Sequence, residues 1–186
     1  MKKIHSILFF LLLFIMAGVF IYNENFSEDA VKERIINQEG YIIKLQKESV
    51  PTEFFIKPEW ISFTSEEPQT IDQVVFKDDQ TNVVLMEVWN RENDIYFSFG
   101  SEYKLDRQSG DLLVNYIISP DGFSSTSGMN DVLLFDVNHN EIPHGQWGTG
   151  PAEQFGFGVN PEQYDAIKEG FFVQYYLFNK YSYKKD

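Results

Sequence analysis

Cysteine is absent from the 186 residues of this chain. Its absence excludes disulfide bonds, a thiol nucleophile, a cysteine-ligated metal and a lipid-modified cysteine. The folded part of the chain must therefore be held together by packing or by a hard metal ion.

Basic residues are scarce. The 15 Lys and Arg stand against 28 Asp and Glu, and Lys2 and Lys3 precede an apolar run, so that beyond Tyr22 only 13 basic residues remain and the net charge is −15. Such a surface lacks the positive charge that binding to a phosphate backbone requires, and anionic lipid head groups repel it. Nucleic acid is excluded as a partner, whereas cations and neutral ligands are compatible.

Catalytic motifs are also lacking. The hydroxyl-rich segment 124–128 does not form the Gly-x-Ser-x-Gly elbow of a serine hydrolase, and the chain has only three histidines to act as a base. Carboxylate pairs for glycoside hydrolysis remain an alternative, with Glu87, Asp94, Asp131 and Asp136 on or beside predicted strands. Because acidic residues are so abundant, no particular pair stands out.

The N-terminus carries the clearest pattern in the chain. An uninterrupted apolar run extends from Ile7 to Tyr22 and follows Lys2 and Lys3. Counting from Ile4, the apolar segment 4–22 is close to the length of a membrane span and longer than the apolar part of most signal peptides. Small residues do not precede a cleavage site at the required spacing, and acidic residues follow the run, so we expect an uncleaved anchor. The alternative is a secreted protein with a cleaved signal; both place the rest of the chain outside the cytoplasm.

A helix followed by a strand is predicted next. Asn25 or Ser27 can cap a helix whose inward side would carry Val31 and Ile35, and Gly40 is a natural stop. The segment 41–46 then alternates as a strand does.

From Pro51 onward the pattern is that of an antiparallel β domain. Aromatic residues make up 17% of the chain, and they favour strands and a buried interior. Strands are predicted near residues 54–56, 60–64, 73–77, 82–89, 95–105, 112–119, 132–137, 155–159 and 171–183.

A late helix should begin at Asn160 and Pro161, which suit its cap and first position, and end at Gly170. The run 171–178 that follows is apolar on both faces, which predicts a central strand covered on both sides.

An oxygen-rich segment is the candidate metal site. Asp136, Asn138 and Asn140 alternate as ligands do in calcium loops. Gly is missing where Glu141 stands and a bidentate Glu where Trp147 stands, and a hairpin turn explains the same residues. We therefore favour the turn and keep calcium as the alternative.

A transition-metal site at His139, Glu141 and His144 is a weaker hypothesis. In a strand, positions 139 and 141 share one face and 144 lies on the other, and the spacing of a helical two-histidine motif is absent. Two surface histidines in a loop explain the pattern better.

The segment 145–151 sets Trp147 among three glycines. An exposed indole there could stack on a sugar or grip a partner, with Gln146 and Thr149 beside it; alternatively, Trp147 folds onto the sheet as a lid. These three residues are the candidate ligand site. Trp60 and Trp89 are predicted to be core or sheet-surface residues, with core packing favoured, although a carbohydrate platform of surface aromatics is kept as an alternative.

The sequence thus predicts a mostly β (α+β) protein, with an N-terminal membrane helix and an antiparallel β-sandwich or rolled-sheet domain with one or two short helices. Residues 1–22 would form the membrane anchor or signal segment, 23–50 a helix–strand entry segment, and 51–186 the extracytoplasmic β domain. We expect a cell-surface protein, single-pass with its C-terminal domain outside, that binds an envelope protein or glycan. The alternatives are a glycan hydrolase and a calcium-stabilised module.

Overall fold

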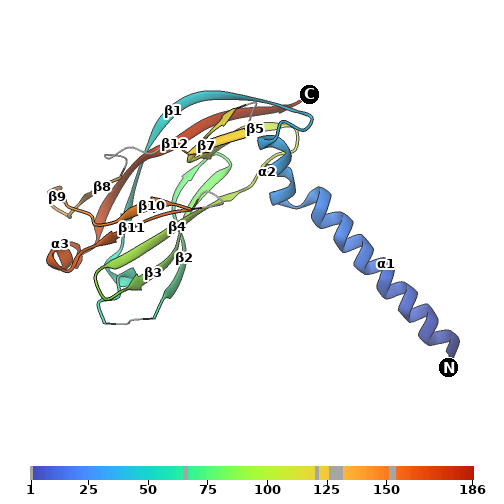
Figure 1. Cartoon of the computed structure of the whole chain (residues 1–186), viewed down its shortest axis with the longest axis horizontal. Coiled ribbons are helices and arrows are strands. Elements are labelled where there is room, and N and C mark those ends of the chain that lie inside the picture. The colour runs from blue at the N-terminus through green and yellow to red at the C-terminus, as the bar shows by residue number, and fades with distance from the viewer. Residues whose placement is uncertain (1, 65–66, 120–121, 126–131, 151–153) are drawn as a thin grey trace.

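The computed structural model of the chain describes residues 2–64, 67–119, 122–125, 132–150 and 154–186. They form a mostly β protein with two antiparallel sheets and a few helices, which confirms the mostly β, antiparallel part of the predicted fold class. The long strands β1 and β12 lie along one layer and β2, β3 and β4 along the other (Figure 1). The strands are β1 (Tyr41–Ile56), β2 (Gln69–Asp78), β3 (Thr81–Asn90), β4 (Ile95–Tyr103), β5 (Ser109–Val114), β6 (Tyr116–Ser119), β7 (Gly122–Ser125), β8 (Val132–Phe135), β9 (Glu141–Ile142), β10 (Trp147–Thr149), β11 (Phe155–Val159) and β12 (Phe171–Lys185).

The first sheet has the order β1-β12-β8-β9, and β5 also pairs with β12; the second has the order β10-β11-β4-β3-β2. A separate hairpin joins β6 and β7. The strand β12 is central, because β1 pairs with it along its length on one side while β8 and β5 pair with successive halves of the other. Its predicted central position is confirmed. Its faces differ from the expectation, since buried residues alternate with half-buried ones from Phe171 to Tyr176.

Two apolar clusters hold the structure together. The larger one fills the space between the sheets with residues such as Leu85, Phe97, Phe157 and Tyr175, all fully buried. The smaller one lies where α2 covers one end of the first sheet, and it is built from Val31, Ile35, Tyr41, Tyr103, Leu112, Val114, Tyr181 and Tyr183. Strand β12 contributes to both clusters and connects them.

The helix α2 (Glu28–Ile36) forms as predicted. The Ser27 hydroxyl accepts a hydrogen bond from the Ala30 amide at 3.2 Å, and Val31 and Ile35 are buried beneath the helix. Gly40 follows with a φ of 73°, a conformation that favours glycine.

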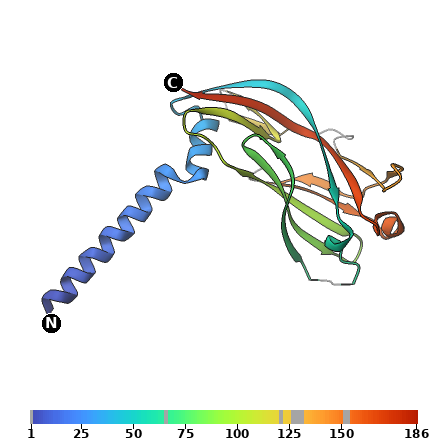
Figure 2. The ribbon, with the colours of Figure 1, turned by 180° about the vertical axis from the view of Figure 1, so that it is seen from behind.

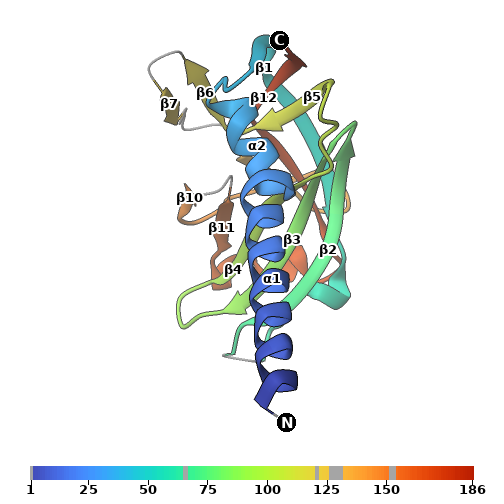
Figure 3. The same cartoon turned by 90° about the vertical axis from the view of Figure 1, so that its right-hand side faces the viewer.

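The helix α1 (Lys2–Phe26) precedes α2, with only Ser27 between them, and it projects away from the sheets (Figure 1). In Figure 3, α1 stands in front of the sheets, with α2 at its upper end. The apolar side chains described along it are exposed; Phe14, for example, is 83% accessible. Among the residues that the structure describes, no helix is long and apolar enough to cross a membrane, so the expected span over 4–22 is not found there.

Two predicted elements differ in the structure. Residues 60–64 are not a strand: Pro58–Trp60 forms a 3-10 turn, η1, because Pro58 starts the turn and cannot donate to a sheet. The strand predicted at 54–56 is the end of β1, which runs across the expected boundary between residues 50 and 51. Shifts of register between Leu45 and Thr52 accommodate Pro51, which an edge strand tolerates.

The late helix is shorter than expected. It consists of the 3-10 turn η2 (Pro161–Gln163) and the single turn α3 (Tyr164–Ile167), at the end of the two sheets that lies opposite α1 (Figure 2). Gly170 closes it with a φ of 88°, as the sequence predicts.

Replacing Gly170 with alanine should lower the free energy of unfolding by about 2–4 kcal/mol, through overpacking and left-handed backbone strain. A Cβ there would lie 2.4 Å from Phe55 Cζ and 2.6 Å from the Ile56 carbonyl oxygen. Gly148→Ala is the matched control, because a Cβ at that position meets nothing within 4 Å. Urea denaturation of both variants measures the effect, and equal stabilities would contradict this account.

Candidate functional site

The candidate ligand residues lie on β10 and its approach. Trp147 pairs with the buried Phe157 across β10 and β11, so its half-buried indole faces the core, against which it packs. Backbone bonds of 2.8 Å join Gly145 N to Gly158 O and Gly158 N to Gln146 O. Gln146 and Thr149 are exposed, and residues 151–153 lie outside the described part of the chain. The indole therefore forms part of the edge of the core.

The candidate calcium residues form a closed turn. Asp136 Oδ1 accepts hydrogen bonds from the amides of Asn138 and Asn140, and Oδ2 accepts one from the Asn140 side chain, each at 2.8 Å. These bonds, led by the one from the Asn140 side chain, lower the pKa of Asp136 below its usual value. His139 takes a φ of 61° and stacks on Phe172 with ring centroids 5.2 Å apart. The turn connects the paired strands β8 and β9 of the first sheet.

Among the described residues, including the Asp136 turn, no group of three or more His, Asp or Glu side chains is placed to hold an ion. Glu141 lies on β9, and His144 Nδ1 lies 3.0 Å from the Gly145 carbonyl oxygen.

The carboxylates considered for glycoside hydrolysis lie in different surroundings. Asp94 is buried and paired with Arg91, Glu87 is exposed on β3, and Asp136 belongs to the turn after β8 in the other sheet. Asp131 and residues 126–128 lie outside the described part of the chain.

The other two tryptophans differ from each other. Trp60 is half-buried against the main cluster, with Lys57 Nζ 5.0 Å from its ring centre. Trp89 is 41% exposed, so the favoured position in the core is wrong and Trp89 lies on the surface of the sheet. The register explains why: Val88 pairs with the buried Phe97, and Trp89 therefore points to the opposite face of the sheet, beside Tyr96.

That outer face of the second sheet holds an arginine in a specific geometry. The Arg91 guanidinium lies 4.2 Å from the Tyr96 ring centre and makes two bonds of 2.6 and 2.5 Å to Asp94. The hydrogen bonding with Asp94 raises the pKa of Arg91 above its usual value. Gly156 and Gly158 on β11 leave the room that this arrangement needs, since a Cβ on either would overlap Tyr96 or Asp94.

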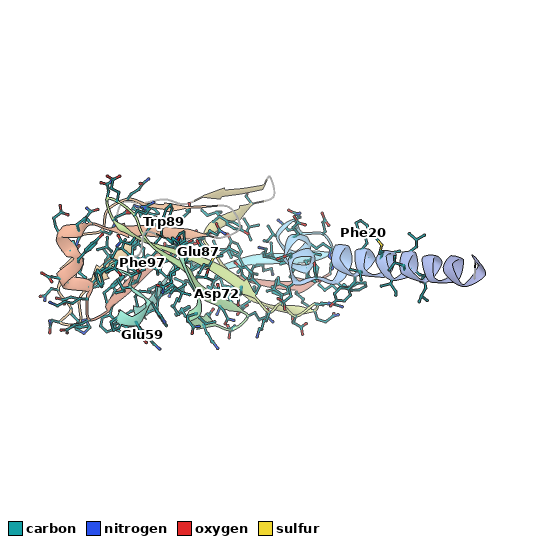
Figure 4. All side chains as sticks on the ribbon, turned by 90° about the horizontal axis from the view of Figure 1, so that it is seen from below. Phe20, Glu59, Asp72, Glu87, Trp89 and Phe97 are labelled. Carbon is teal, nitrogen blue, oxygen red and sulfur yellow. The ribbon has the colours of Figure 1, made fainter. Side chains whose placement is uncertain are left out.

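A hollow of about 260 Å³ opens further along the same face, between α2 and the second sheet. Its floor is apolar, and its walls carry carboxylates from α2, β2 and β4. We call it the acidic groove, although Lys32 of α2 also lines it; its other principal lining residues are Asp29, Asp72, Val84, Met86 and Glu102. The view from below the molecule labels Asp72, Glu87 and Trp89 along this side (Figure 4).

Sequence reasoning missed the acidic groove. One signal was available: residues 83–86 are apolar without alternation, so that Val84 and Met86 are apolar on the face opposite the core. The acidic walls come from three distant segments and depend on strand pairing and on the docking of α2.

A second hollow, of about 830 Å³, lies open on the first sheet beside a cluster in which one lysine meets three aspartates. Lys180 Nζ contacts Asp78 at 3.0 Å, Asp79 at 2.8 Å and Asp111 at 3.7 Å. Hydrogen bonding to Asp79 is the main cause that raises the Lys180 pKa above its usual value. These pairs fasten the turn between β2 and β3 to the first sheet.

Comparison with protein-family models, with curated proteins and with solved structures finds no match for this chain.

Asp136→Asn should lower the melting temperature by a few degrees near neutral pH. The folded-state pKa of Asp136 is depressed, so its carboxylate stabilises the fold above the ordinary carboxyl pKa of 3.8, and that contribution is lost as the pH falls below it. The gap between the two proteins should therefore close in acid. Melting curves from neutral pH to acid test this, and a gap that is constant with pH would contradict it.

Trp147→Ala should lower the free energy of unfolding by about 1–3 kcal/mol, because a half-buried ring leaves the core edge. Trp89→Ala is the comparison, and it should cost less than about 1 kcal/mol, since that indole is more exposed and lies outside the core. Denaturant titration followed by circular dichroism ranks the two. A larger loss for Trp89 would overturn the assignment of their faces.

Proposed function

We propose that this chain is a binding protein attached to a membrane through α1, with its acidic β domain outside the cytoplasm. The observation that carries the proposal is the apolar surface of α1. Residues such as Leu12, Phe14, Ile15 and Phe20 are exposed on different sides of the helix. A soluble protein rarely exposes an apolar surface of this kind, and a helix that is apolar all round belongs in lipid or in a protein interior.

The charge distribution supports the orientation. Lys2 and Lys3 precede the apolar run, and the segment beyond Tyr22 carries a net charge of −15. Basic residues stay on the cytoplasmic side of a membrane segment, and acidic head groups repel a domain of this charge from the bilayer surface. Residues 4–22 would then serve as an anchor, or as a signal that is cut off to release a secreted form.

A binding role is favoured over catalysis by the same residues. Of the carboxylates considered for hydrolysis, Asp136 accepts the hydrogen bonds of its turn and Asp94 forms an ion pair with Arg91. Glu87 is exposed on β3. The outer face of the second sheet, in contrast, exposes an indole, apolar residues and carboxylates together. We propose that the domain binds an envelope partner protein or glycan there.

Replacing Leu12 and Ile15 together with lysine should release the protein from membranes. Each charge at the middle of a lipid-buried helix costs about 2.5–3.5 kcal/mol. Flotation with neutral phosphatidylcholine vesicles measures attachment. The control converts Ile42 and Leu45, which are exposed on β1, to lysine, and it should float as the parent does.

Intact mass in membrane and medium fractions of an exporting host completes this test. The full-length mass in the membrane fraction supports an anchor, and a form shortened by about 20 to 30 residues in the medium supports a cleaved signal. A full-length protein that stays in the cytoplasm and does not float with vesicles would contradict the proposal.

A further inference from the structure

Basic side chains gather at the end of the sheets from which α1 projects. Three segments meet there: the start of β1 (residues 41–47), the connection from β4 to β5 (residues 104–108) and the end of β12 (residues 181–186) (Figure 1). We call them together the basic end. They hold six basic and two acidic residues, a net charge of +4, whereas the rest of the chain beyond Tyr22 carries −19. The total of −15 therefore hides a separation of charge.

Backbone pairing brings the segments of the basic end together. Tyr41 pairs with Lys185, and the Lys185 amide donates a hydrogen bond to the Gln108 carbonyl oxygen at 2.7 Å. The Tyr41 hydroxyl donates one to the Arg107 carbonyl oxygen at 3.1 Å. All six basic side chains of the basic end are exposed. The fold thus collects, on one surface, charges that are more than a hundred residues apart in the sequence.

Arg107 joins the basic end to α1. Its guanidinium lies 5.0 Å from the Phe26 ring centre and donates a hydrogen bond to the Phe26 carbonyl oxygen at 3.2 Å. Tyr22 stacks on Phe26, with ring centroids 6.1 Å apart. Tyrosine rings suit the boundary between lipid and water, and arginine suits the lipid phosphates there. The basic end therefore lies where an embedded α1 would leave the bilayer.

Acidic neighbours of the basic end offset its charge without reversing it. Residues 28–40, which include α2, carry four acidic and two basic residues. Lys180, the next residue along β12, meets three aspartates. With both neighbours counted, this end of the molecule is neutral and the remaining chain beyond Tyr22 carries −15. An anionic surface would therefore attract the basic end and repel the rest of the domain.

We propose that the basic end docks on the head groups of anionic phospholipids, with Arg107, Lys184 and Lys185 against their phosphates. The same lipids repel the acidic remainder, so that attraction and repulsion together keep the β domain upright over the bilayer. Continuity with α1 favours lipid as the occupant, because the embedded helix would hold the basic end at the level of the head groups. The inference rests on the proposed membrane attachment and adds the class of lipid that the domain recognises.

The test compares flotation of the full-length protein with two kinds of vesicle. One kind is neutral phosphatidylcholine, and the other is equal parts of phosphatidylcholine and phosphatidylglycerol. The lipid concentration that gives half-maximal flotation should be lower with the anionic vesicles, and added salt should reduce the difference. Neutral vesicles report on α1, and the difference between the two kinds reports on the basic end.

Lys184→Gln and Lys185→Gln combined should raise the half-maximal concentration about tenfold with anionic vesicles, because two charges leave the lipid surface. With neutral vesicles this variant should match the parent. Arg107 is left in place, since its removal would also disturb the contact with Phe26.

The matched control, Lys57→Gln with Lys168→Gln, removes the same charge far from the basic end. Both lysines are exposed; Lys57 follows the opposite end of β1, and Lys168 follows α3. This variant should stay within about twofold of the parent with anionic vesicles, since only the long-range charge has changed. Circular dichroism verifies that both double variants are folded.

Two outcomes would overturn the inference: the parent floats equally well with both kinds of vesicle, or the two double variants lose affinity for anionic vesicles equally. Failure to float with neutral vesicles alone would contradict the anchor at α1. A preference for anionic vesicles that the Lys184 and Lys185 variant loses would support the basic end in either case.

Discussion

The pairing of β12 on both sides is the constraint on which the rest of this structure depends. This strand carries β1 along one edge and β8 and β5 along the other, and its side chains enter both apolar clusters. The smaller cluster in turn seats α2 through Val31 and Ile35. The position of α2 next to the second sheet, and with it one wall of the acidic groove, therefore follows from the packing of β12.

Local chemistry made several elements predictable. The cap at Ser27, the glycines with positive φ at positions 40 and 170, and the long apolar strand near the C-terminus are each encoded by neighbouring residues. Other features depend on pairing between distant segments. The union of residues 41–46 and 54–56 in one strand required the continuous partner β12, and the outward direction of Trp89 required the register with β4.

The candidate site shows the same division. The turn predicted at Asp136 forms, because the Asp136 side chain accepts hydrogen bonds from nearby backbone amides of the same segment. Trp147 could not be placed from its glycine-rich surroundings, since its direction follows from its pairing with Phe157. The acidic groove could not be predicted at all, because Asp29, Asp72 and Glu102 become neighbours only when α2, β2 and β4 have assembled.

The junction between α1 and α2 sets the reach of the domain. Only Ser27 separates the helices, and Arg107 of the β4–β5 connection lies over the Phe26 ring while donating a hydrogen bond to the Phe26 carbonyl. In the described residues, no flexible tether therefore separates α1 from the helix α2 that packs on the sheets. A chain embedded through α1 would hold its β domain within a few nanometres of the lipid surface, where it meets only partners that are themselves close to the membrane.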